Sequence, residues 1–253
     1  MKIVASIQAR MGSSRLPGKV LADICGKPML LWQVERIRRS QNVNKVVIAT
    51  TISKEDDKIE EFCIKNSIEC YRGSEHDVLD RIASLLKDLG VDLHIEFCGD
   101  SPLSDSKLID EFIEYYLKNI NEVDYISNAP KTSYPPGFEI TIYPSKVLIE
   151  VDKLIDKDDP FREHVGYNIT RFPDKFKLRI MKAPNSLTAP NTYLEVDTDR
   201  DLEFIRKVFE YFVKNKIQNF SLSQILDFLK NNPELSKSNQ NIDRRWKTVY
   251  GKF

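Results

Sequence analysis

This sequence of 253 residues lacks several features that would assign it quickly to a class. It has no run of about 18 apolar residues, which excludes an ordinary transmembrane helix. Its start has no apolar stretch followed by a small-residue cleavage site, so we expect no signal peptide. Lysine and arginine together number 38, as do aspartate and glutamate. This zero net charge argues against bulk affinity for nucleic acid or for an anionic membrane, so any anion site must be local.

Cysteine and histidine are also scarce. The four cysteines form no C-x-x-C pair, and the three histidines have no ligand spacing around them. This pattern argues against a structural zinc site. Isolated thiols are typical of a reducing compartment, so we expect a cytoplasmic protein.

Two common phosphate-binding motifs are missing from the first loop, "ASIQARMGSSRLPGKVL" at residues 5–21. A Walker A motif needs four residues between its glycines, but Gly12 and Gly18 have five between them, and Val20 stands where Ser or Thr is required. The chain has no G-x-G-x-x-G stretch either. The loop nevertheless carries Arg10 and Lys19 among glycines and serines, directly after an apolar run.

Apolar runs alternate with amphipathic stretches over residues 1–128. The pattern predicts strands at 2–7, 45–50, 68–73, 93–100 and 123–128, and helices at 28–39, 53–66, 77–90 and 105–119. A glycine at the end of the third helix is expected to close it. This rhythm is typical of a mainly parallel sheet with helices on both faces.

The second half of the sequence is less regular. Residues 138–144 alternate as a strand does, 162–172 have helical spacing, and 193–215 are expected to form a strand, a turn and a helix. We find no linker and no repeat, so we expect one domain over 1–253, with 134–190 as an insertion or flap upon it. The polar, basic end is expected to form an arm.

Polar clusters follow three of the expected strands. They are the first loop, "CGDSPL" at 98–103 and "DTDRD" at 197–201. Ligands of open parallel sheets bind at the carboxyl ends of strands, so we expect the three clusters to meet. Arginine, lysine and backbone N–H groups of the loop would hold phosphates, and carboxylates would hold Mg²⁺. Alternatively, Asp100, Asp197 and Asp199 only cap the helices that follow them.

The stretch "RMGSSRLPGK" at 10–19 resembles the R-x-G-S-x-R-x-P-G-K loop of cytidylyltransferases that activate sugar acids, the CMP-sialic acid and CMP-KDO synthetases. The likeness is greatest to their spore-coat polysaccharide biosynthesis (SpsF-like) branch, through "QAR" at 8–10, "YRGSEHDVLDR" at 71–81, "CGDSPL" and "VDTDRDLEFI" at 196–205. It extends from Met1 to about residue 210. It implies a Rossmann-like nucleotidyltransferase (GT-A-like) α/β fold with a mixed, mainly parallel sheet.

The resemblance also implies an activity and its partners. The enzyme would transfer CMP from CTP to a sugar acid with release of pyrophosphate, using Mg²⁺, for a cell-surface polysaccharide or for protein glycosylation. A homodimer is implied as well. Residues 1–130 would be the nucleotide-binding half, 131–230 the acceptor-binding half and a candidate dimerisation region, and 231–253 the C-terminal arm.

Site residues are implied by the positions that match the family's motifs. Catalytic roles would fall to Arg10, Lys19 and Asp100. The nucleotide would be contacted by Gln8, Ala9, Arg10, Gly12, Ser13, Arg15, Lys19, Arg72, Gly73 and Ser74. The metal would be held by Asp100 and Asp197, and the acceptor by Glu139, Arg162, Glu163 and His164.

The sequence departs from the SpsF-like pattern on the acceptor side. Thr141 stands where a glutamate is common, and Glu195 stands where a threonine is common. The acceptor therefore stays open among sialic-, legionaminic-, pseudaminic- and KDO-like acids. Two alternatives also stay open: a nucleotidyltransferase that uses another NTP or a sugar-1-phosphate, and a nucleotide-binding scaffold without catalysis. Asp77 and Arg81, four residues apart, could form a helix-surface pair or have a functional role.

Overall fold

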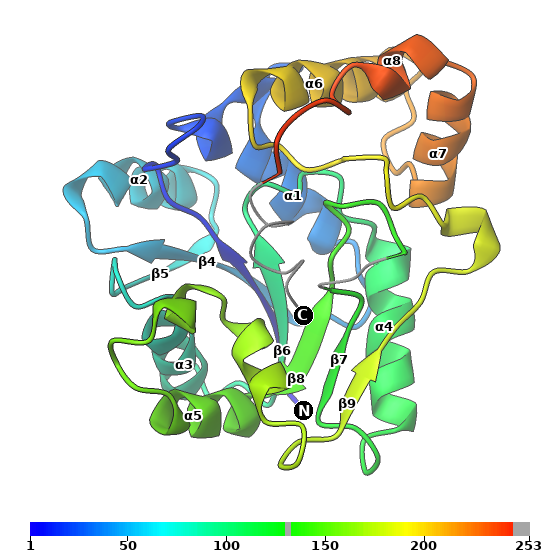
Figure 1. The fold of residues 1–253 in the computed structure, drawn as a ribbon. Coiled ribbons are helices and arrows are strands. Elements are labelled where there is room, and N and C mark those ends of the chain that lie inside the picture. Colours follow the sequence, from blue (N-terminus) through cyan, green and yellow to red (C-terminus); the bar gives the residue numbers. More distant parts are fainter. Residues whose placement is uncertain (130–132, 245–253) are drawn as a thin grey trace.

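The computed structural model describes residues 1–129 and 133–244. A seven-stranded sheet forms its centre, in the order β5-β4-β1-β6-β8-β7-β9 (Figure 1). The strands are β1 (Ile3–Gln8), β4 (Lys45–Thr51), β5 (Glu69–Gly73), β6 (Leu93–Cys98), β7 (Tyr125–Ser127), β8 (Thr141–Pro144) and β9 (Leu178–Ile180). Strands β5, β4, β1 and β6 are parallel, β8 is antiparallel to both of its neighbours, and β7 and β9 are parallel. The expected mixed, mainly parallel sheet is confirmed.

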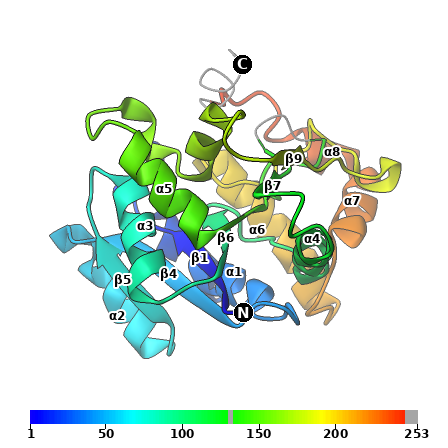
Figure 2. The same ribbon diagram turned by 90° about the horizontal axis from the view of Figure 1, so that it is seen from below.

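Helices cover both faces of the sheet, as the alternating pattern predicted (Figure 2). They are α1 (Met29–Ile37), α2 (Asp57–Lys65), α3 (Val78–Asp88), α4 (Ser106–Lys118), α5 (Ser145–Leu154), α6 (Asp199–Lys214), α7 (Leu222–Lys230) and α8 (Pro233–Lys237). A short hairpin, β2 (Asp23–Ile24) and β3 (Lys27–Pro28), precedes α1. Among the helices that the structure describes, none has the length and apolarity needed to span a membrane.

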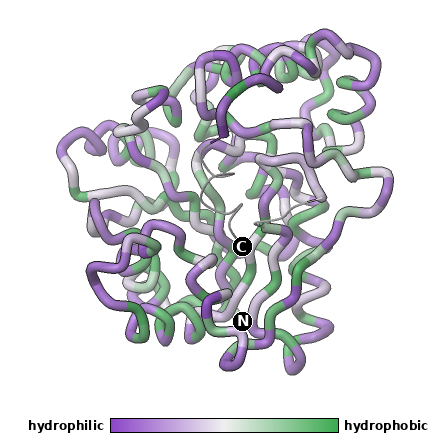
Figure 3. Tube along the Cα trace, in the orientation of Figure 1, coloured by the Kyte–Doolittle hydropathy of each residue, from purple (hydrophilic) through white to green (hydrophobic). Residues whose placement is uncertain are grey.

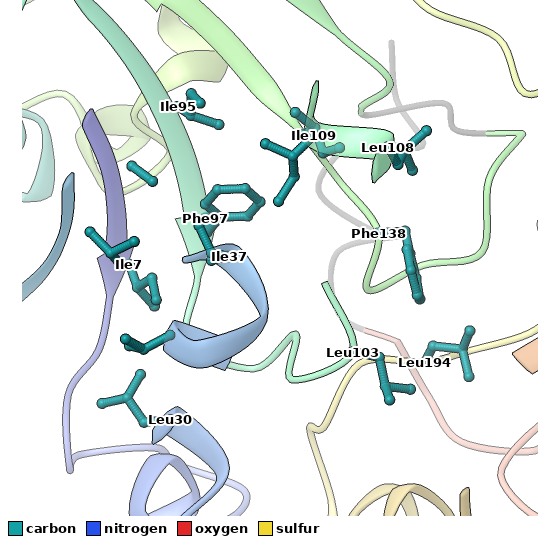
Figure 4. Close-up of a cluster of buried hydrophobic side chains, with 14 of the residues drawn as sticks. Ile7, Leu30, Ile37, Ile95, Phe97, Leu103, Leu108, Ile109, Phe138 and Leu194 are labelled. Carbon is teal, nitrogen blue, oxygen red and sulfur yellow. The ribbon is translucent and has the colours of Figure 1, made fainter. Parts of the chain in front are cut away.

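Two buried apolar clusters lie on opposite faces of the sheet. Neighbouring residues of β1 belong to different clusters because side chains alternate along a strand. The larger cluster joins the sheet to α1, α2, α4, α6 and α7, and Figure 4 shows part of it. The smaller cluster joins the sheet to α3 and α5. Around the outer helices, hydrophobic and hydrophilic positions alternate, as amphipathic helices require (Figure 3).

Local sequence signals explain where several helices begin and end. The Asp77 carboxylate accepts a hydrogen bond from the Asp80 N–H at 2.9 Å and starts α3, and Gly90, with φ +58°, follows its end as expected. Helix α6 begins with a capping box in which Thr198 and Asp201 satisfy each other's backbone N–H groups.

Three expectations for the second half need correction. Residues 193–196 are not a strand of the sheet. They run as an extended segment whose Leu194 N–H donates to the Pro136 carbonyl at 2.7 Å and whose Val196 N–H donates to the Asp100 carbonyl at 2.8 Å. The region 162–172 forms two 3₁₀ helices, Pro160–Glu163 and Gly166–Arg171, because Asn168 ties the turn between them to two carbonyls. Residues 134–190 are not wholly an insertion or flap outside the domain core, since they include β8, which is an inner strand of the sheet.

Candidate active site

The carboxyl ends of β1 and β6 approach each other closely. The Gly99 N–H donates to the Gln8 carbonyl at 2.8 Å, and a Cβ at position 99 would lie only 2.8 Å from that carbonyl oxygen. A larger residue would therefore push the two strand ends apart. This contact brings Asp100 beside the loop that follows β1.

The loop after β1 is held by its own backbone and by one buried carboxylate. Asp56 accepts a hydrogen bond from the Met11 N–H at 2.7 Å. The Met11 carbonyl in turn accepts from the N–H groups of Ser13 and Gly18, both at 2.9 Å. Gly18 has φ +73°, a left-handed conformation that glycine adopts without strain, and the turn there leads into the 3₁₀ helix that starts at Lys19.

Lys19 is the centre of a charge cluster made of three chain segments. Its Nζ lies 2.7 Å from the Val196 carbonyl, 3.1 Å from Asp197 Oδ1 and 3.4 Å from Asp100 Oδ2. Arg15 Nη2 binds the other oxygen of Asp197 at 2.7 Å. Burial lowers the pKa of Lys19, but the two carboxylates outweigh it and the pKa is raised, so the ammonium stays charged. The expected meeting of cations and carboxylates at the strand ends is therefore observed.

A cavity of about 730 Å³ opens beside this cluster, a size typical of small-ligand sites. Eleven of the residues expected in the site line it: Gln8, Ala9, Arg10, Ser13, Arg15, Lys19, Asp100, Glu139, Glu163, His164 and Asp197. Thr141 and Glu195, the two departures from the family pattern, line it as well.

Arg72 does not line the cavity. Its guanidinium forms ion pairs with Asp57 and Glu60 of α2, each at 2.7 Å, and donates to the Thr51 carbonyl at 2.9 Å. These contacts tie the outer strand β5 to α2. Gly12 is also absent from the lining.

Gly73 and Ser74 do not line the cavity either, but they shape one wall of it through Arg81. A Cβ at position 73 would lie 2.6 Å from Arg81 Cγ, and the Ser74 carbonyl accepts from Arg81 Nη1 at 2.7 Å. Arg81 is buried and lines the cavity. Burial, with Arg10 nearby, lowers its pKa to about 10, so it is still a cation at neutral pH. Of the two alternatives for Arg81, the exposed helix-surface pair with Asp77 is wrong, and the functional role stays a prediction.

Asp77 instead pairs with Arg162. The Arg162 guanidinium is buried and turned away from the cavity, 2.8 Å from Asp77 Oδ2 and 3.1 Å from the Ile155 carbonyl, and it also pairs with Asp152. These bonds anchor the 3₁₀ turn whose next residues, Glu163 and His164, line the cavity.

Two partly buried glutamates, Glu96 and Glu139, also line the cavity. Burial raises the pKa of Glu139 to about 7, with Asp100 adding to the shift, although the Gly137 N–H donates to its Oε2 at 2.9 Å. Glu96 was not expected. It accepts from Tyr143 Oη at 2.8 Å and from Gln8 Nε2 at 3.0 Å, and burial raises its pKa. The sequence signal that could have identified it is an acidic residue inside the apolar run of β6.

The donor set of the cluster fits a hard metal ion such as Mg²⁺. Within residues 1–129 and 133–244, no group of three or more His, Cys, Asp or Glu side chains is placed to hold an ion. Asp100 and Asp197 converge on the same ammonium and supply only oxygen atoms. Such a pair suits Mg²⁺, which usually takes its other ligands from substrate phosphates and water.

Comparison with known proteins agrees with this geometry. A family model described as cytidylyltransferase matches residues 4–232. The spore coat polysaccharide biosynthesis protein SpsF of Bacillus subtilis is 32% identical over 92% of this chain and 95% of its own length. A 3-deoxy-manno-octulosonate cytidylyltransferase of Trichlorobacter lovleyi is 37% identical over 122 residues, 47% of this chain and 46% of its own.

A solved structure agrees as well. That of a cytidylyltransferase from Leptospira borgpetersenii superposes with a TM-score of 0.87 and 31% identity, and the match covers 96% of this chain and 100% of that one. With the family match and the cation–carboxylate cluster at the ends of β1 and β6, this chain belongs to the cytidylyltransferase family.

Proposed function

We propose that this cytidylyltransferase transfers CMP from CTP to a sugar acid and releases pyrophosphate, in the synthesis of a cell-surface polysaccharide or glycosylated protein. The observation that carries the proposal is the convergence of Lys19 and Arg15 with Asp100 and Asp197 at one end of the cavity. The names of the two relatives, a spore-coat polysaccharide protein and a sugar-acid cytidylyltransferase, support the choice of acceptor.

The chemistry follows from charge. A hydroxyl oxygen of the acceptor attacks the α-phosphorus of CTP, the bond from that phosphorus to the bridging oxygen breaks, and the hydroxyl proton is released. Such transfers depend on alignment and on neutralisation of phosphate charge. Arg10, Arg15 and Lys19 bind the triphosphate and stabilise the charge that builds on pyrophosphate, with loop N–H groups assisting.

A bound Mg²⁺, held by Asp100 and Asp197, would supply charge neutralisation between phosphate oxygens. In the structure, Lys19 lies 3.1 Å from one oxygen of Asp197 and Arg15 lies 2.7 Å from the other. The cations must therefore turn from this carboxylate toward the phosphates when CTP binds. The proposal thus predicts that CTP and the ion bind together rather than separately.

The acceptor would occupy the part of the cavity lined by Glu139, Thr141, Glu163 and His164. Carboxylates and hydroxyls there can bind the hydroxyl groups of a sugar. Thr141 is shorter than the glutamate common at this position and carries no charge. Its Oγ1 is also hydrogen-bonded to Ser127 Oγ at 2.8 Å. This difference would give the pocket an acceptor preference different from that of relatives with the glutamate. We also propose that the enzyme works in the cytoplasm as a homodimer.

The test is to incubate the protein with each of the four NTPs, Mg²⁺ and a panel of sialic-, legionaminic-, pseudaminic- and KDO-type acids, and to measure pyrophosphate. We expect release only with CTP and a sugar acid. Release with another NTP or only with sugar-1-phosphates would redirect the proposal to a guanylyl- or uridylyl-type enzyme. Tight CTP binding without turnover on any acceptor would indicate a scaffold. Sedimentation velocity tests the homodimer.

A further inference from the structure

A buried arginine of the C-terminal arm contacts the segment that carries Asp197. The side chain of Arg244 is 1% exposed. Its Nη2 binds Asp201 Oδ1 at 2.7 Å and its Nη1 binds Asp201 Oδ2 at 3.1 Å, a two-pronged pairing that arginine makes and lysine cannot. The guanidinium also lies 4.5 Å from the ring centre of Tyr193 and 3.5 Å from Glu195 Oε1. Arg244 therefore contacts both ends of the segment 193–201.

Asp201 links Arg244 to the backbone at Asp197. The Oδ2 atom of Asp201 accepts hydrogen bonds from the Asp197 N–H at 3.1 Å, from the Thr198 N–H at 2.9 Å and from Thr198 Oγ1 at 2.8 Å. Asp201 is fully buried. A buried carboxylate needs a paired cation, and Arg244 supplies it. Without Arg244, the carboxylate that holds the Asp197 backbone would be left without its cation.

The arm also contacts the loop after β1 directly. The Asp243 carbonyl accepts a hydrogen bond from Arg15 Nη1 at 3.2 Å, while Arg15 Nη2 binds Asp197 at 2.7 Å. Asn239 adds a second link, since its Nδ2 donates to the Tyr193 carbonyl at 3.0 Å and to Asp201 Oδ1 at 2.9 Å. Both ends of the Asp197 turn and one of its cations are thus attached to residues 239–244.

We propose that Arg244 is a positioning residue for the triphosphate end of the site, which holds the turn that presents Asp197 to Lys19 and Arg15. This inference rests on the proposed role of that cluster in binding CTP. It adds a residue outside the part of the chain that the family model matches, which ends at residue 232. Groups that orient ligand-binding side chains typically affect affinity or activity by about 10- to 100-fold.

The test compares three variants after circular dichroism has shown that they are folded. Arg244→Gln removes the charge, Arg244→Lys keeps the charge but not the paired hydrogen bonds, and Arg36→Lys is the matched control. Arg36 is also buried and lies over the Phe220 ring, but its guanidinium donates to the carbonyls of Leu103, Ser104 and Phe220 instead of binding the segment 193–201.

Two readouts separate positioning from a loss of stability. The first is the Kd of CTP with Mg²⁺ by calorimetry. The second needs no nucleotide: acetic anhydride labels free amines, and mass spectrometry reports the labelling rate of Lys19. We expect Arg244→Gln to raise the Kd of CTP by about ten-fold or more and to raise the labelling rate of Lys19 several-fold. Arg244→Lys should give values between those of the wild type and of Arg244→Gln. Arg36→Lys should lower only the thermal midpoint.

Each outcome is decisive. If folded Arg244→Gln protein binds CTP and labels at Lys19 as the wild type does, or if Arg36→Lys changes both as strongly, the positioning role is overturned. If the wild type itself does not bind CTP, the proposed function fails, and the Lys19 labelling rates still decide whether Arg244 positions Asp197. If Arg244→Gln does not fold, Arg244→Lys supplies the comparison.

Discussion

Replacing Lys19 with methionine tests the central charge cluster. The change keeps an unbranched side chain that ends where Cε of the lysine lies, and it removes the ammonium that lies 3.1 Å from Asp197 and 3.4 Å from Asp100. The two carboxylates would then face each other without their shared cation. Breaking a buried ion pair costs about 3–5 kcal/mol, but the Asp100 side chain is 28% exposed, so we expect about 2 kcal/mol of lost folding free energy.

The effect on catalysis should be larger. A preorganised group that stabilises charge in a transition state is typically worth about 10²–10³ in kcat, or about 3–4 kcal/mol. We therefore expect kcat/KM for CTP of the Lys19→Met variant to fall by this factor, measured as pyrophosphate release with a saturating acceptor. Lys45→Met is the control, because Lys45 pairs with Glu69 at 2.5 Å on the outer strands and does not line the cavity. It should keep full activity.

A second assay of the same variant needs no turnover. In the wild type, Lys19 competes with any cation for Asp100 and Asp197. Without the lysine, Mg²⁺ alone should bind the two carboxylates better and raise the thermal midpoint more, since a ligand stabilises a fold according to its concentration over Kd. The reasoning would be refuted by Lys19→Met protein with activity within about three-fold of the wild type, or with no larger Mg²⁺-induced shift.

Three further predictions concern stability and loop position. Burial lowers the pKa of His94 to about 3, so below pH 6.5 this residue binds a proton in the unfolded chain but not in the folded protein. Lowering the pH from 7 to 4.5 should therefore reduce the free energy of unfolding by about 3 kcal/mol through this residue, and the His94→Gln variant should not show that part of the loss. Gly137 has φ +98°, and a Cβ there would lie 2.5 Å from the Leu194 carbonyl carbon, so Gly137→Ala should destabilise by about 3 kcal/mol in urea. The control is Gly26→Ala, which should cost only about 1 kcal/mol, because Gly26 also has a positive φ of +79° but has open space around it. Asp56→Asn weakens the hold on the loop after β1 and should raise the KM for CTP about ten-fold in the pyrophosphate assay, whereas an unchanged KM would argue against that anchor.

The position of the cluster was predictable from the sequence because it follows a rule of sheet geometry. Lys19 lies in the loop that follows β1, and Asp100 lies in the loop that follows β6. The two strands are parallel, and such strands end at the same edge of the sheet. Asp197 was expected there for a partly wrong reason, since no strand precedes it. Hydrogen bonds from the segment 193–196 to two other loops bring it to the cluster instead.

Other site features depend on contacts between distant segments, which the local sequence pattern does not predict. Arg81 has an acid four residues before it, which is typical of an exposed helix pair, yet it is buried because the backbone of Gly73 and Ser74 packs against it. Arg72 points to α2 because two acids of that helix happen to lie within reach. Arg244 lies in a polar, basic stretch that was expected to be an arm of the chain. Part of that arm, residues 245–253, lies outside the described residues.

The arm of residues 239–244 has a consequence for synthesis of the enzyme on the ribosome. Chains grow at about 5–20 residues per second, so Lys19 and the loop around it exist for tens of seconds before Arg244 is made. In the last part of that time, after Asp201 has been made, the turn that carries Asp197 does not yet have Arg244 to pair with Asp201. If Arg244 has the proposed positioning role, a nascent chain that ends before it would bind CTP about ten-fold more weakly. CTP would then add less stability to the fold until Arg244 has been made.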